Sequence, residues 1–174
     1  MRTLASTIKL ELDPFHLARI ARIDAEDFSL VRRKVREQLA KQGEPASEEF
    51  LDEGVLALKQ YYVVALLDPR NQHAVSDTID PFWHFHILDT KNYFKFGEEV
   101  FGQYIHHEPL DHANPVEVAR VRSLYEYTAG IYGAMFNYVN PAFYPPALSD
   151  TRLICFHNKV EASEVHERGL FAVA

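Results

Sequence analysis

Apolar residues recur at helical spacing along most of the chain. Phe28, Val31, Val35 and Leu39, for example, are three or four positions apart, which places them on one face of an α-helix. Comparable patterns predict five helices, which begin near residues 13, 26, 47, 80 and 114. Three of these starts are an Asp-Pro or Asn-Pro pair, and a capping side chain followed by proline is typical of a helix start.

The segments outside these helices have weaker patterns. We predict a short strand at residues 7–12, and a short strand or an extended arm at residues 151–157. Residues 140–146 contain three of the nine prolines and are predicted to form a loop, while residues 161–174 form either one more helix or a loose tail. No internal repeat or glycine-rich linker is present. We therefore predict a single domain over residues 1–174 with an all-α architecture, a mainly helical bundle.

Composition and charge narrow the class of protein. Hydrophobic residues make up 47% of the 174 residues and aromatic residues 13%, which is ample for a hydrophobic core. With 25 acidic and 18 basic side chains, the formal net charge is -7. A field of this sign repels phosphate backbones, so nucleic acid is not an expected partner.

The distribution of apolar residues and the cysteine count bear on the compartment. No apolar run approaches the roughly 18 residues that a membrane-spanning helix needs, and the N-terminal residues lack a secretory signal pattern. The single cysteine, Cys155, cannot form an internal disulfide. We expect a cytoplasmic protein that does not bind membranes.

The most unusual stretch is "DPFWHFHILDT", residues 80–90, which holds two histidines, two aspartates and the only tryptophan. Side chains two positions apart do not share a face of a regular helix, so His84 and His86 would point in opposite directions. His86 then falls on the aromatic face of the helix, together with Asp89 and Thr90. Burying these polar groups costs several kcal/mol unless they are paired with each other or with an ion.

Two interpretations of this stretch remain open. In the first, His86 and Asp89 form a buried structural cluster with a tyrosine, and Asp80 is a helix cap. In the second, the histidines bind a metal ion, and Asp80, four residues before His84, orients a metal-bound imidazole.

A second histidine-rich segment follows the fourth predicted helix. Residues 101–112, "FGQYIHHEPLDH", contain three histidines and two acids within seven positions. A turn of the chain there would bring His106 or His107 back toward the first two histidines. Nitrogen and oxygen ligands of this kind suit Zn(II) or Fe(II). The spacing matches no His-Glu-x-x-His or Cys-x-x-Cys signature.

From these two segments we predict a divalent metal centre. We expect His84 and His86 to approach a common site, with the chain from Asp80 to His84 non-helical or in a tight first turn, and with His107 closing the site. Four further side chains are candidates as alternative ligands or as hydrogen-bonding partners of the ligands: Asp80, Asp89, Tyr93 and His106.

The same two segments resemble the glycine-rich-domain-containing-protein-like family, whose members have an Asp-x-x-Trp-His-x-His core, a later tyrosine and a His-x-Pro. The matching positions are Asp80, Trp83, His84, His86, Tyr93, His107 and Pro109. Some members have a cysteine just after the tyrosine, where this sequence has "FKFGEEV", and no glycine-rich tract is present here. The resemblance implies a site in this region and no established reaction.

We expect a cytoplasmic metal-binding protein that uses Zn or Fe, either as a binding protein or as a metal-dependent enzyme acting on a small, partly apolar substrate. The alternative is a non-catalytic protein-interaction module in which the histidine and aromatic cluster is structural. In that case residues 140–146, "NPAFYPP", would be an exposed docking element for a protein partner or a second copy of the chain.

Overall fold

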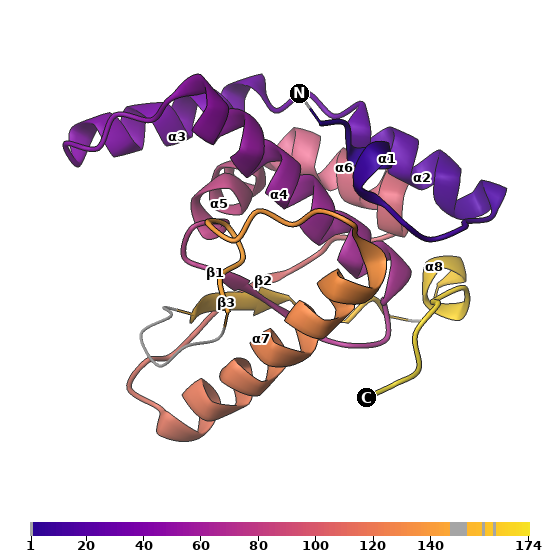
Figure 1. The fold of residues 1–174 in the computed structure, drawn as a ribbon. Coiled ribbons are helices and arrows are strands. Elements are labelled where there is room, and N and C mark those ends of the chain that lie inside the picture. Colours follow the sequence, from indigo (N-terminus) through magenta and orange to yellow (C-terminus); the bar gives the residue numbers. More distant parts are fainter. Residues whose placement is uncertain (1, 147–152, 158, 162) are drawn as a thin grey trace.

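The computed structural model describes residues 2–146, 153–157, 159–161 and 163–174 (Figure 1). Within these ranges the chain forms eight helices and three short strands, which confirms the predicted mainly helical class. In chain order the elements are α1 (Leu4–Thr7), α2 (Pro14–Asp24), α3 (Ser29–Lys41), α4 (Glu48–Leu67), β1 (His73–Ser76), α5 (Asp80–Leu88), α6 (Thr90–Phe101), β2 (His107–Pro109), α7 (Pro115–Met135), β3 (Leu153–His157) and α8 (Glu164–Glu167).

The five predicted helix starts are present, and capping explains several of them. The Asp13 carboxylate accepts a hydrogen bond from the backbone N–H of His16 at 2.9 Å, and the Asn114 side chain caps α7 in the same way. The described residues form eight helices rather than five, because the fourth predicted helix is two and the short helices α1 and α8 lie outside the five predicted ones. The backbone leaves the helical region at Asp89 (φ -81°, ψ 63°), where α5 ends and α6 begins.

The predicted N-terminal strand is wrong. Residues Leu4–Thr7 form the short helix α1, capped by Thr3, and the following segment contributes only an isolated bridge between Ile8 and Phe136. The last residues are partly helical, since α8 occupies Glu164–Glu167.

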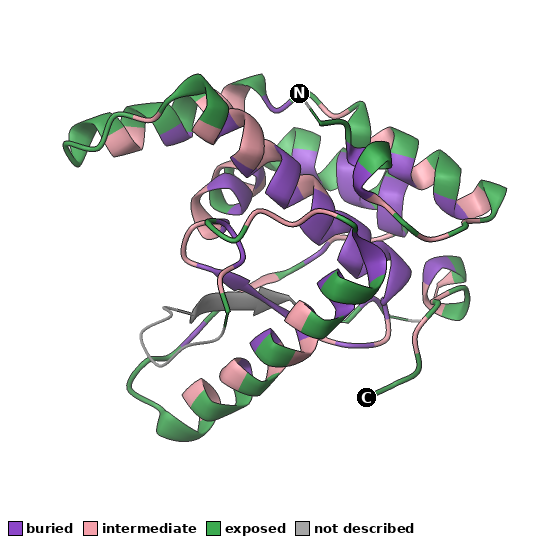
Figure 2. Cartoon of the chain, viewed as in Figure 1, coloured by how far each residue is buried: buried purple, intermediate pink, exposed green. Residues whose placement is uncertain are grey.

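Helix α4 is the centre of the fold, and α2, α3, α5 and α7 all pack on it. Every residue from 60 to 67 is buried, which fits a helix that is apolar on all sides. Figure 2 shows the buried residues concentrated along α4 and on the inner faces of the helices around it. In the part of the chain that the structure describes, none of the helices combines the length and the hydropathy required to span a bilayer.

Three strands that are distant in the sequence form a small antiparallel sheet of order β1-β3-β2. The central strand β3 confirms the predicted strand for residues 153–157, while residues 151 and 152 lie outside the described part. Strands β1 and β2 were not predicted. The register aligns His157 of β3 with His73 of β1 and with His107 of β2. Helix α7 packs against β1 and β3.

Residues 140–146 form the predicted loop, but their aromatic side chains are not an exposed docking element. Phe143 and Tyr144 are buried. The Tyr144 ring stacks between Tyr125 and Tyr132, with ring centroids 4.4 and 4.5 Å away, and its hydroxyl donates to the Ala74 carbonyl of β1 at 2.8 Å. Burial raises the pKa of Tyr144 well above its ordinary value, so the ring remains neutral in the core. The loop therefore fastens α7 to the sheet.

Candidate functional site

Helix α5 carries the Asp-x-x-Trp-His-x-His stretch and is held against α4 by a glycine. The ring of Phe82 packs directly on Gly54, where a side chain would collide with it. Trp83 is fully buried on the same helix. The helix is continuous from Asp80 to Leu88, so the expectation of a non-helical chain between Asp80 and His84 is wrong.

Two glycines bring the chain back from the end of α6 to the start of α5. Gly102 ends α6 in the left-handed region (φ 73°), where glycine is favoured over other residues. A Cβ on Gly97 would lie 2.7 Å from the carbonyl oxygen of Gln103, so glycine permits this close return. The backbone then passes the buried Ile105 and places His107 beside the N-terminus of α5.

His107 and Asp80 form a partly buried pair. The Nε2 atom of His107 lies 2.8 Å from Oδ1 of Asp80, and the two side chains are only 17% and 15% exposed. The Trp83 ring packs on the His107 ring with centroids 4.9 Å apart. His84 is exposed one turn along α5, and its ring centroid is 6.5 Å from that of His107. Asp80, His84 and His107 are thus brought together at one place on the surface.

His86 belongs to a different, buried cluster, and the prediction that it approaches a common site with His84 is wrong. Its Nδ1 lies 2.7 Å from the Tyr62 hydroxyl, and Phe28 and Phe96 pack around the ring at 4.9 and 5.0 Å. The two histidines cannot share a site because residues two apart on a regular helix point to opposite sides.

The partner of His86 is not Asp89 but Glu26, whose Oε1 lies 3.5 Å from Nε2 of His86. Asp89 instead accepts a hydrogen bond from Asn92 at 2.7 Å. Burial acts to raise the pKa of Glu26, but contacts with His86 and with Arg22 outweigh it and lower that pKa below its ordinary value. The pattern near residue 26 predicts a helix start and gives no sign that Glu26 contacts His86, and the tyrosine expected in the buried cluster is Tyr62.

Tyr93 and His106, the other candidates, lie beside the surface cluster without joining it. The Tyr93 hydroxyl donates to the Ile105 carbonyl at 2.7 Å and accepts from Nε1 of Trp83 at 3.1 Å, so Tyr93 ties α5 and α6 to the chain that leads to β2. His106 and its neighbour His107 have different surroundings: His106 lines a pocket, whereas His107 contacts Asp80 and Trp83.

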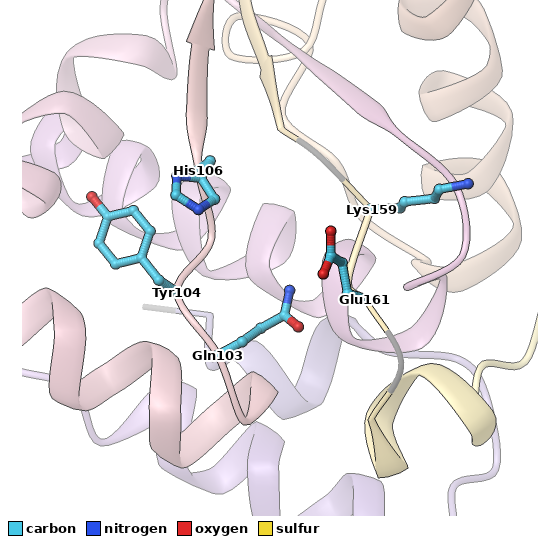
Figure 3. A pocket seen from close by; sticks show the side chains of 5 residues that line it. All are labelled: Gln103, Tyr104, His106, Lys159 and Glu161. Carbon is cyan, nitrogen blue, oxygen red and sulfur yellow. The ribbon is translucent and has the colours of Figure 1, made fainter.

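The side of the chain occupied by His106 has a pocket of about 230 Å³. Figure 3 shows the His106 ring, the Gln103 amide and the Glu161 carboxylate directed toward this pocket, while the Lys159 ammonium extends away from it. The Tyr104 ring packs on His106 with centroids 4.9 Å apart.

The predicted set of three histidine ligands is therefore not assembled. Among the residues that the structure describes, no three side chains of histidine, cysteine, aspartate or glutamate lie close enough to hold a metal ion. What the structure does bring together is a carboxylate-imidazole pair, Asp80 and His107, with a second imidazole, His84, beside it.

Fold and site together define a mainly helical protein with a small antiparallel sheet and an aspartate-histidine pair where helix and sheet meet. A family model described as UCP032817-like matches residues 18–123, well over half of the chain, and the chain belongs to this family.

This match corrects the resemblance to the glycine-rich-domain-containing-protein-like family, which rested on two short segments of the sequence. The matched region includes both histidine-rich segments, from Asp80 to His107. No curated protein and no solved structure matches the chain.

Proposed function

We propose that this protein binds a divalent transition metal ion, Zn(II) or Fe(II), through His84 and His107, with Asp80 orienting His107. The observation that carries the proposal is the 2.8 Å contact between Nε2 of His107 and Oδ1 of Asp80. Histidines that bind metal through one ring nitrogen usually donate the other N–H to a carboxylate or a carbonyl group. Asp80 would hold Nε2 in this way and leave Nδ1 of His107 for the ion.

The position of His84 supports a shared ion with a small rearrangement. Two imidazoles bound to one ion at about 2.1 Å have ring centroids roughly 5 to 6 Å apart, and the rings of His84 and His107 are 6.5 Å apart. Among the described residues His84 contacts the rings of Phe85 and His107 and has no hydrogen-bond partner, so a change of rotamer breaks no bond there.

An ion held by two protein ligands keeps coordination positions for water or for a small molecule. Closed structural zinc sites use four protein ligands, whereas catalytic sites leave at least one position open. The proposed centre is therefore of the open kind, and if the protein is an enzyme, water activated by the ion is the expected nucleophile. The net charge of -7 also favours the approach of a cation.

Trp83 provides a direct test, because it is the only tryptophan and its ring lies 4.9 Å from the His107 ring. Metal-free protein, purified without a histidine tag, is titrated with Co(II), which quenches tryptophan fluorescence at short range, and with Zn(II) by calorimetry. We expect one equivalent to bind. Asp80→Asn should weaken binding by about 10-fold to 100-fold, and His84→Ala, which removes one of the two proposed ligands, by at least as much.

The matched control is the adjacent histidine on the other side of the chain. His106→Ala should bind Co(II) as the wild type does, while His107→Ala should abolish the quenching of Trp83. The proposal is wrong if no stoichiometric binding occurs, or if the loss of His106 weakens binding as much as the loss of His107.

A further inference from the structure

A groove of about 480 Å³ lies between α7, the turn that follows α4, and the last residues of the chain. The lining from α7 includes Arg120, Ser123 and Leu124. The turn that follows α4 contributes Arg70 and Asn71. The groove shares no lining residue with the cluster of Asp80, His84 and His107. Its volume lies within the range of about 300 to 1,000 Å³ that is typical of small-molecule sites.

The charged side chains that line the groove are cationic, whereas the net charge of the whole protein is negative. Its described lining includes three cations, Arg70, Arg120 and Lys159, and no carboxylate side chain, although the net charge of the chain is -7. The Lys159 ammonium that points away from the pocket of Figure 3 is one of the three. A local concentration of positive charge in a partly enclosed groove attracts anions.

The Arg70 guanidinium is held in place by neutral partners. Nη2 of Arg70 donates to the carbonyls of Gly169 and Phe171 at 2.8 and 2.7 Å, which fixes the guanidinium without cancelling its charge. Among the described residues no carboxylate lies within 4.0 Å of Arg70 or of Lys159. Nη1 of Arg120 donates to the Gln72 side chain at 3.1 Å.

The floor of the groove is equally ordered. The Asn71 amide and the Tyr127 hydroxyl both donate to the buried Asp68 carboxylate, each at 2.7 Å. Asp68 also lies 3.2 Å from Nε2 of His73, so a third side chain holds the carboxylate in place. Cationic and polar groups that are fixed before a ligand arrives lose little conformational freedom on binding.

We propose that this groove binds a small organic anion, a carboxylate or a phosphate monoester with an apolar body. The anionic group would contact Arg70, Arg120 and Lys159. The apolar part would cover Leu124 and Val173, and Val173 is 65% exposed. A ligand with both features buries apolar surface and pairs with the cations in the same event.

The test uses four probes that share one hexyl chain: hexanoate, hexyl phosphate, the neutral hexanol and the cationic hexylamine. Each is titrated into the full-length, isotope-labelled protein, and amide resonances are followed by NMR. We expect saturable shifts at Asn71, Gln72, Ser123 and Tyr127 with the two anions, and no shifts there with hexanol or hexylamine. Comparing hexanoate with hexyl phosphate distinguishes the two anionic groups.

Two variants test the role of charge. Arg120→Gln and Lys159→Gln should each weaken hexanoate binding by about tenfold, whereas Arg33→Gln, an exposed site on α3, should leave it unchanged. Well-dispersed spectra of each variant establish that it is folded. The proposal is overturned if hexanol binds as tightly as hexanoate, if neither anion gives saturable shifts in the groove, or if Arg120→Gln binds hexanoate like the wild type.

Discussion

Gly54→Ala is the substitution that tests the packing of α5 most directly. In an open helical position, alanine stabilises a helix by about 1 kcal/mol relative to glycine. At Gly54 the new Cβ would lie 2.5 Å from two carbons of the Phe82 ring and closer still to its Cζ, far inside normal contact. Phe82 cannot move aside easily, because it is buried and packs against Phe50 and Phe143.

The two effects have opposite signs, and their magnitudes decide the outcome. Overpacking a filled core typically costs about 1 to 3 kcal/mol, and here the clash involves the rigid ring of a buried residue. We expect Gly54→Ala to lower the free energy of unfolding by about 1 to 2 kcal/mol, which corresponds to a drop in Tm of roughly 2 to 8 °C for a protein of this size.

The same substitution at Gly130 of α7 is the control. No heavy atom lies within 4 Å of a Cβ placed there, so Gly130→Ala should raise the free energy of unfolding by up to about 1 kcal/mol. Urea unfolding followed by circular dichroism measures both variants. If Gly54→Ala is as stable as the wild type, the close packing of Phe82 on α4 is not present in solution, and the placement of Asp80 and His84 by α5 loses its basis.

Three further results are expected. Asp68→Ala should cost about 3 kcal/mol in urea unfolding, because donors from Tyr127 and other buried groups lose their acceptor. Burial acts to raise the pKa of Asp68, but hydrogen bonds from His73 and Tyr127 lower it below its ordinary value of 3.8. The contribution of the Asp68 carboxylate to stability is therefore complete above pH 3.8 and is lost as the pH falls below that value. Asp68→Asn should accordingly lose less stability between pH 5 and pH 3 than the wild type does. His86→Ala should cost roughly 2 to 4 kcal/mol in urea unfolding, while His84→Ala, at an exposed site, should change the stability of metal-free protein by less than about 0.5 kcal/mol.

Local patterns in the sequence predicted local structure well. The caps at Asp13 and Asn114 and the apolar run of α4 identified helices because each depends on neighbours within a few residues. Helical spacing also indicated that His84 and His86 point in opposite directions. The prediction that both histidines serve one site required an irregular helix start, because His86 needed a partner. The structure instead has a regular helix, and the two histidines point in opposite directions.

The partner of His86 could not be found from the sequence, because it is set by contacts between distant segments. Glu26 and Tyr62 approach His86 only after α3, α4 and α5 have packed together. Strands β1 and β2 left no recognisable pattern either: all four residues of β1 are buried, so polar and apolar positions do not alternate, and β2 has only three residues, one of them a proline.

The central place of β3 in the sheet has a consequence for the order of folding. Within the sheet, β2 pairs only with β3, which is synthesised after the whole of α7 and lies beyond the matched region that ends at residue 123. Helices can pack through short-range contacts while the chain is still emerging from the ribosome, whereas a strand pairing across so long a loop must wait for its partner. His107 therefore lies on a strand that stays unpaired until β3 has been synthesised, so the contact between His107 and Asp80 gains the support of the sheet only after that step.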